Sequence, residues 1–355
     1  MSFKEIKGHD QAIYALKQDL EQGRLAASYL FLGPEGVGKR KTAVTLAKAL
    51  NCQKEEFDTS TTHPQTPLSI NPEHYQDNTG EISVFSSESR GIDSCDSCPS
   101  CLKIDAQNHP DVHWITGVTG DYIKIEDIRQ LKKEIGLRPY EGKRKVFIID
   151  NAHLFTAEAS NALLKILEEP PGQASIILVS SKFALLFKTI VSRCRIIRFY
   201  PLARSGLAEI LKEDYRLDAL TAHFLAYFCE GRLGCGVELK DMDILKEKNK
   251  VIDEFALFSR PNEARAVIEH KETFRNYLNI LATWFRDIYM AKIGLPQTEL
   301  IHLDRKADLL KVAERYNFSD LEVIMNFISD SLRYLEENIN PKLLLSNLRM
   351  ELSRT

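Results

Sequence analysis

The chain has 355 residues, of which 44% are hydrophobic and 27% are charged, and its formal net charge is −3. This composition is typical of a soluble globular protein of two or three domains, and it excludes a chain whose whole surface attracts nucleic acid, so any DNA contact would be local or shared with partner chains. There is no run of about 18 apolar residues and no signal-peptide pattern, and we therefore expect a cytoplasmic protein with no membrane partner.

Residues 1–200 alternate short apolar strands with helical stretches, which predicts an α/β domain with a parallel sheet. Of the expected strands, three are unbroken apolar runs and two are each interrupted once, by His113 and by Arg198. Strands that are covered on both faces of a sheet have this character. The expected strands are Tyr29–Leu32, Val112–Ile115, Val146–Ile149, Ile176–Val179 and Ile196–Phe199.

The first expected strand leads into a glycine-rich loop and then a helical stretch, the arrangement of a P-loop that binds nucleotide phosphates. The residues expected to hold phosphate are Gly33, Gly36, Gly38 and Lys39. The motif requires Ser or Thr next, because that hydroxyl ligates Mg²⁺, and this chain has Arg40 instead. Thr42 cannot take over, since two steps along a helix point it to another side.

Residues 53–94 are rich in Ser, Thr, Asp, Glu, Asn and Pro. They are predicted to form a mobile surface insertion that is too polar to build a core.

A cysteine cluster follows the insertion. Cys95, Cys98 and Cys101 place three thiols within seven residues, and Cys52 lies just after the P-loop helix. Four thiolates form a closed tetrahedral Zn²⁺ site, whereas disulfides are not expected in the cytosol. For the fourth ligand His63, His74 and His109 are alternatives to Cys52. An iron–sulfur cluster is the rival metal centre, but the fourth close cysteine of that pattern is absent.

Asp150 directly follows the third expected strand and fits a Walker B carboxylate that holds Mg²⁺. The alternative is that Asp150 only caps the following segment. Hydrolysing enzymes of this type usually have Glu at the next position, but this chain has Asn151, whose amide cannot accept a proton. Arg40 and Asn151 are thus departures at two separate catalytic positions, and they predict no ATP hydrolysis. Because Lys39 is retained, ATP binding is predicted to be weak or absent.

Arg193 lies in the tripeptide Ser192-Arg193-Cys194, between the last two expected strands. An Arg at the edge of a nucleotide domain can reach the γ-phosphate of a neighbouring subunit as an arginine finger. The alternative is an ordinary solvated side chain.

After Pro201 the strand pattern ends and amphipathic helices follow. Residues 201–247 are predicted to form a small three-helix domain, and residues 248–355 a domain of longer helices. The expected helices are Ser205–Glu213, Leu217–Glu230, Gly236–Glu247, and then 263–291, 303–315, 318–336 and 341–353.

Together these residues resemble the delta-prime subunits of bacterial DNA polymerase III clamp loaders, AAA+ relatives of the ATPase subunits in the same complexes. The resemblance runs over nearly the whole chain. Its further marks are the segments 9–12, 125–129, 138–142, 161–170 and 340–345.

The resemblance implies a RecA-like AAA+ domain, an all-α lid and an all-α collar for oligomerisation. It implies a five-subunit ring with gamma/tau ATPase and delta subunits, which opens a sliding clamp and loads it on primer-template DNA. This subunit would be a non-hydrolysing stator with no polymerase chemistry of its own. The implied residue roles are Arg193 as trans arginine finger, Cys52, Cys95, Cys98 and Cys101 as zinc ligands, and Ser180 or Ser181 as the sensor-1 residue.

Two other interpretations stay open. One is an ATP-hydrolysing, gamma/tau-like motor subunit of the same loader that tolerates Arg40. The other is a zinc-containing DNA-binding adaptor outside any ring, against which the near-neutral charge and the lack of a basic cluster argue.

Overall fold

The computed structural model describes residues 2–54, 93–116, 122–168, 171, 173–257, 271–294, 296, 299–337 and 339–354. The chain divides into two compact units, one made of Met1–Gly33 with Lys39–Phe199 and the other of Pro34–Gly38 with Tyr200–Thr355. The predicted insertion 53–94 lies outside the described residues apart from its two ends.

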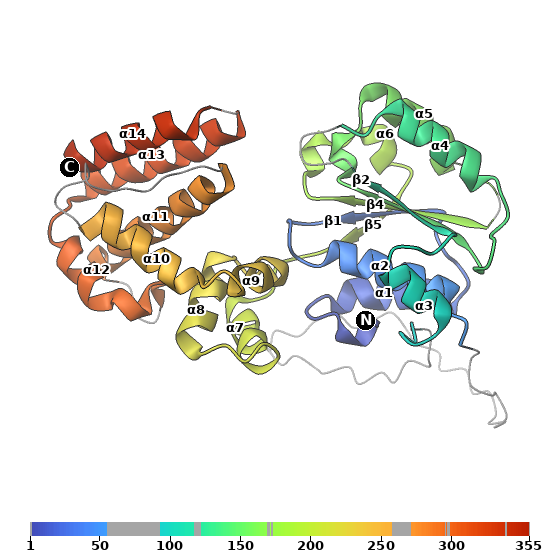
Figure 1. The fold of residues 1–355 in the computed structure, drawn as a ribbon, viewed down its shortest axis with the longest axis horizontal. Helices are drawn as coiled ribbons and strands as arrows, with labels where there is room; N and C mark the ends of the chain where they lie inside the picture. The colour runs from blue at the N-terminus through green and yellow to red at the C-terminus, as the bar shows by residue number, and fades with distance from the viewer. Residues whose placement is uncertain are drawn as a thin grey trace, which may run out of the picture. The chain divides into compact units, whose positions relative to one another are not determined.

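The first unit is built on a parallel sheet with the strand order β2-β3-β4-β1-β5 (Figure 1). The five predicted strands are confirmed, with ends that shift by at most two residues. Their observed bounds are β1 Ser28–Leu32, β2 Val112–Thr116, β3 Lys145–Asp150, β4 Ala174–Ser180 and β5 Arg195–Arg198.

Helices cover both faces of this sheet, which explains why its strands are apolar throughout. One face carries α1 (Asp10–Glu21), α2 (Lys39–Asn51) and α3 (Pro99–Asp105), and the other carries α4 (Ile125–Ile135), α5 (Ala157–Glu168) and α6 (Lys188–Val191). Alternate strand residues serve the two cores: Leu30 packs in the cluster with Ile128 and Leu163, whereas Phe31 points to the opposite face and is equally buried. Short 3₁₀ helices lie at Phe3–Glu5, Ala152–Leu154 and Phe183–Leu185.

The carboxyl ends of β1 and β3 carry the loop residue Gly33 and the carboxylate of Asp150, at the edge of a parallel sheet where α/β proteins bind ligands. Gly33 is required sterically, because a Cβ there would lie 2.3 Å from the carbonyl oxygen of Phe199. The rest of the loop, Pro34–Gly38, groups with the second unit. There the carbonyl oxygen of Gly36 accepts a hydrogen bond from the N–H of Gly234 at 2.7 Å.

The second unit is helical. Its helices are α7 Arg204–Glu213, α8 Ala219–Phe228, α9 Leu233–Lys240, α10 Ile244–Ile252, α11 Lys271–Lys292, α12 Lys306–Ala313, α13 Phe318–Glu336 and α14 Pro341–Arg354, with a π-helix at Asp253–Leu257 and a 3₁₀ helix at Leu303–Arg305. The prediction of one helix over Gly236–Glu247 is wrong. The chain turns between α9 and α10, where Asp243 takes the left-handed conformation with φ 47°, so the helical backbone cannot continue.

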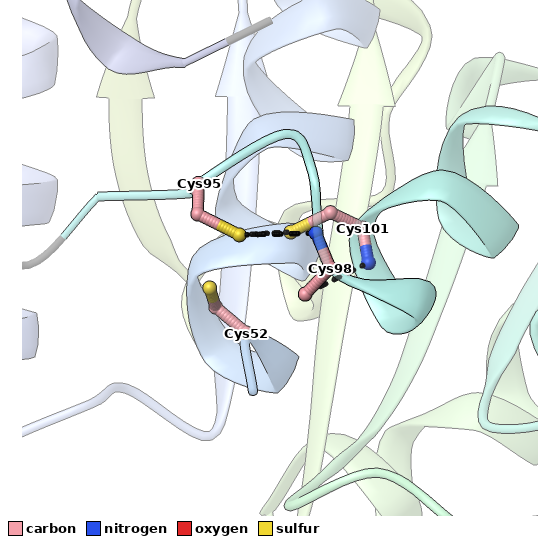
Figure 2. Close-up of side chains that lie close together, drawn as sticks. All are labelled: Cys52, Cys95, Cys98 and Cys101. Atoms are coloured by element: carbon pink, nitrogen blue, oxygen red, sulfur yellow. Dashed lines mark hydrogen bonds between the residues drawn. The ribbon is translucent and has the colours of Figure 1, made fainter. Parts of the chain in front are cut away.

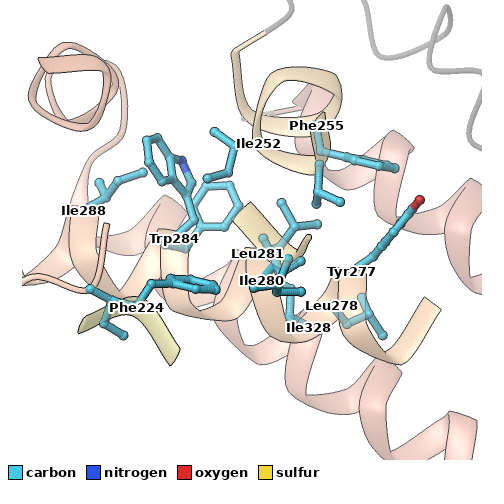
Figure 3. Close-up of a cluster of buried hydrophobic side chains, with 14 of the residues drawn as sticks. Phe224, Ile252, Phe255, Tyr277, Leu278, Ile280, Leu281, Trp284, Ile288 and Ile328 are labelled. Carbon is cyan, nitrogen blue, oxygen red and sulfur yellow. The ribbon is translucent and has the colours of Figure 1, made fainter. Parts of the chain in front are cut away.

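A single apolar core runs through the described helices of this unit (Figure 3). The predicted apolar stripe of α11 is confirmed: Trp284 and Leu281 are fully buried, and Tyr277 is 8% exposed. Because the core extends from α7 to α14, the division into a lid (201–247) and a collar (248–355) stays a prediction, and its boundary falls inside α10. Among the described residues, no helix is long and apolar enough to span a bilayer.

Candidate functional site

Lys39 and Asp150, the predicted phosphate-binding lysine and the predicted Walker B carboxylate, lie next to the carboxyl ends of β1 and β3. Lys39 begins α2 and is buried, and its Nζ donates to the carbonyl oxygen of Gly33 at 2.7 Å. Asp150 ends β3 and accepts a hydrogen bond from the N–H of Asn151 at 2.9 Å. The first unit therefore keeps a cation and a carboxylate at the carboxyl ends of its central strands.

Arg40 puts a cation next to the Asp150 carboxylate. Its guanidinium lies 4.0 Å from Asp150 and stacks over the Trp114 ring at 4.8 Å from the ring centre. A guanidinium has donors only and cannot ligate a metal. Thr42 is buried in α2, away from the exposed Arg40. The position where the motif requires a Mg²⁺ ligand thus carries a positive charge, and this charge lies beside Asp150.

Asn151 follows β3 and Ser180 ends β4, and these two strands are neighbours in the sheet. Asn151 adopts the left-handed conformation, with φ 53° and ψ 44°, and starts the 3₁₀ helix Ala152–Leu154. Ser180 ends β4, is buried, and its hydroxyl lies 3.3 Å from Nδ1 of His153. Of the two serines in the sensor-1 prediction, Ser180 is buried and Ser181 is partly exposed. The contact of Ser180 with His153 was not predicted from the sequence.

Arg193 follows α6 and is held by a partner from another element. Glu168, the last residue of α5, accepts from both Nε and Nη2 of Arg193 at 2.5 Å, and the carbonyl oxygen of Thr189 accepts from Nη1 at 2.9 Å. The Arg193 side chain stays 32% exposed. Glu168 was missed, because nothing in the sequence links these residues across 25 positions.

The four cysteines converge, as predicted (Figure 2). Cys52 follows α2, Cys95 precedes α3, Cys98 caps α3 and Cys101 lies in its first turn. Their sulfur atoms all lie within 4.8 Å of one another. Four sulfurs at 2.3 Å from zinc would be roughly 3.8 Å apart, and the Cys95 and Cys101 sulfurs are 4.0 Å apart. The cluster could therefore hold a tetrahedral metal ion.

His109 is not the fourth ligand, because its ring nitrogens have other partners. Nε2 lies 3.0 Å from the Ser100 hydroxyl, and Nδ1 accepts from the N–H of Asp111 at 3.1 Å. His63 and His74 lie outside the described residues. Among the described residues, Cys52 completes the group.

Comparison with known proteins gives the family. The family model described as DNA polymerase III, delta subunit, matches residues 8–80 and 81–203. The model described as DNA polymerase III, delta subunit, C terminal, matches residues 243–353. The chain belongs to the DNA polymerase III delta subunit family.

Individual relatives agree with this membership. The delta' subunit of Bacillus subtilis (strain 168) is 26% identical over 98% of this chain and 97% of its own length. The tau subunit of Escherichia coli (strain K12) is 30% identical over 70% of this chain, which spans only 34% of tau. The solved structure of a gamma subunit-related protein from Thermotoga maritima is 17% identical, covers 96% of this chain and 98% of its own, and has a TM-score of 0.47. The family models and the delta' subunit of Bacillus subtilis confirm the resemblance to delta-prime subunits.

In this member of the delta subunit family, hydrogen bonds outweigh burial at two thiols of the cluster, Cys95 and Cys98, and lower their pKa. Burial opposes ionisation at Cys95, but hydrogen bonds from the backbone and hydroxyl of Ser97 and from the N–H of Cys98 outweigh it and lower the pKa of Cys95 to about 6. Burial raises the pKa of Cys52 and Cys101. Since metals bind thiolates, a lowered pKa would favour metal binding at Cys95.

The loop 138–142 is held by one buried carboxylate. Asp111 accepts from the N–H groups of Tyr140 at 2.7 Å, Glu141 at 2.9 Å and Gly142 at 2.7 Å. Burial opposes ionisation of Asp111, but these three bonds outweigh it and lower the pKa of the carboxyl group. The loop is therefore fixed to the start of β2 by charge-assisted hydrogen bonds.

Replacing Asp111 by Asn is expected to lower the free energy of unfolding by about 1.5–3 kcal/mol, because the amide loses the charge and one acceptor oxygen. The folded-state pKa is depressed, so this contribution is present above the unfolded pKa of about 3.9 and is lost as the pH falls through the folded value. Urea unfolding at neutral pH measures the difference, and Glu126→Gln, on an exposed side chain, is the control. Equal stability of the Asp111 variant and the wild type would contradict the prediction.

Proposed function

We propose that this chain is a non-hydrolysing stator subunit of the DNA polymerase III clamp loader, which supplies Arg193 in trans to a neighbouring ATPase subunit. The observation that carries the proposal is the contact between Arg40 and Asp150, together with Asn151 in the place of the catalytic Glu. Mg²⁺ placement and water activation are the two things that phosphoryl transfer needs from these positions. This site lacks the hydroxyl that helps to place Mg²⁺ and the carboxylate that activates water.

The partners we propose are the gamma/tau ATPase and delta subunits in a five-subunit ring, with the sliding clamp and primer-template DNA contacted through the complex in the cytoplasm. Family membership supports a role in DNA polymerase III. The residues before Arg193 support a subunit contact there, because Phe183 and Leu185 are 54% and 57% exposed. Large apolar side chains on a surface are common at interfaces.

We propose Zn²⁺ for the cysteine cluster, held by Cys52, Cys95, Cys98 and Cys101. The four sulfurs fit the metal in number, type and spacing. Sites of four cysteines are closed, so the metal would have a structural role and would join the end of α2 to α3.

The second candidate is an ATP-hydrolysing, gamma/tau-like motor of the same loader. The observations that favour it are the retained Lys39 and Asp150 and the 30% identity to tau over 70% of the chain. Such a motor would need Mg²⁺ to bind beside the Arg40 guanidinium, and the like charges disfavour this.

Turnover by the purified chain separates the two candidates. We expect no ATP hydrolysis above background, measured as phosphate release with Mg²⁺ present, and the same background rate for Lys39→Ala. A clear rate in the wild type that disappears in Lys39→Ala would establish the motor and end the stator proposal. Metal analysis of the same sample ensures that the zinc site is loaded.

A further inference from the structure

One side chain of the P-loop helix is buried next to the cysteine cluster. Lys48 lies one turn before Cys52, and its side chain is 0% exposed. Removing an ammonium group from water costs several kcal/mol unless other charges compensate it. The partners of Lys48 therefore show what this position is for.

Lys48 forms ion pairs with two carboxylates of the metal module. Its Nζ donates to Asp96 and, at 2.9 Å, to Asp105. Asp96 lies between Cys95 and Cys98, and Asp105 ends α3 one turn after Cys101. One cation on the helix that leads to Cys52 thus holds both segments that carry the other three thiols.

The bond to Asp96 fixes a backbone conformation that a non-glycine residue adopts at a cost. Asp96 has φ 53°, in the left-handed region, and its carboxylate also accepts from the Ser94 hydroxyl at 3.0 Å. This turn allows the N–H of Cys98 to reach the sulfur of Cys95 at 3.3 Å. The ion pair therefore lies at the turn that carries Cys95 and Cys98, without contact to their sulfur atoms.

Resting on the zinc site proposed above, we propose that Lys48 is a positioning residue that assembles the four thiols before the metal binds. It brings no net positive charge to the site, because the single positive charge of Lys48 faces the two negative charges of Asp96 and Asp105. Without Lys48, these two carboxylates would repel each other and the nearby thiolates. The segments that carry Cys95 and Cys101 would then separate from α2.

The test is the affinity of full-length Lys48→Met for Zn²⁺, measured by competition with a chromophoric chelator. Loss of a group that orients metal ligands is expected to weaken binding by about 10–100-fold. Lys41→Met is the matched control, since Lys41 is exposed on the same helix and should leave the affinity unchanged. Equal affinities of Lys48→Met and wild type would overturn the proposal.

A second measurement separates positioning from general stability. If Lys48 positions the thiols, the rise in Tm that zinc gives to the metal-free protein becomes smaller in the variant. If Lys48 only stabilises the fold, both forms lose the same amount and the proposal fails. Should Lys48→Met not fold, Asp105→Asn removes one of the two ion pairs at a side chain that is 43% exposed, and unchanged zinc affinity there overturns the proposal. A wild type that binds no zinc rejects the metal site itself.

Discussion

Replacing Arg193 by Ala is expected to slow ATP hydrolysis at the neighbouring subunit's site by roughly 10³–10⁵-fold, the contribution of an arginine finger to phosphoryl transfer. The physical reason is that the planar guanidinium would stabilise charge on the transferred phosphoryl group. In the isolated chain this guanidinium is bound to Glu168 and Thr189 but remains partly exposed. The Arg193 guanidinium would therefore leave Glu168 and contact the γ-phosphate of the neighbouring subunit's ATP.

The measurement is single-turnover hydrolysis in a reconstituted loader whose other ATPase sites are inactivated, so that only the site facing Arg193 contributes. Arg193→Lys is expected to recover little, because an ammonium lacks the planar fork. Lys188→Ala removes an exposed cation on α6, the short helix just before Arg193, and controls for charge. Assembly is checked by gel filtration. Unchanged hydrolysis in an assembled Arg193→Ala loader would remove the finger assignment.

Replacing Cys101 by Ser is expected to reduce the metal content of the purified protein from about one zinc per chain to close to none, because a structural site needs all its thiolates. Cys101 is fully buried, so a solvent molecule cannot easily take the place of the lost thiolate on the metal. Elemental analysis of freshly purified protein measures the metal, and it also distinguishes zinc from iron.

Cys194→Ser is the matched control, since Cys194 lies outside the cluster and should leave the metal content unchanged. Removal of zinc from the wild type with a chelator should lower Tm, and the same treatment should have no effect on Cys101→Ser. A full complement of zinc in Cys101→Ser would exclude the four-cysteine site.

Much of the fold could be predicted because it depends on patterns that are local in the sequence. The strands are apolar runs, and the buried stripe of α11 repeats at helical spacing, so each signals its own burial. The turn between α9 and α10 has no such signal. Its residues continue a helical pattern, and the sequence does not show that Asp243 adopts the left-handed conformation.

The site shows the same division. The loop glycines, Asp150 and the close trio of cysteines were predicted because their chemistry needs fixed spacings. The partners Glu168, His153 and Asp105 were not predicted, because each contact joins elements that only the folded sheet brings together. Cys52 was assigned by resemblance, because no spacing rule links a cysteine to a ligand cluster that lies so far along the chain.

The bond between the N–H of Gly234 and the carbonyl of Gly36 has a consequence for synthesis of the chain on the ribosome. Domains that emerge first generally fold first, and the strands that flank β1 are complete once residue 199 has emerged. The loop after β1, in contrast, has to wait for α9 before it gains this contact. A nascent chain that pauses in between would expose an unfinished loop on a finished sheet, which a protease could recognise.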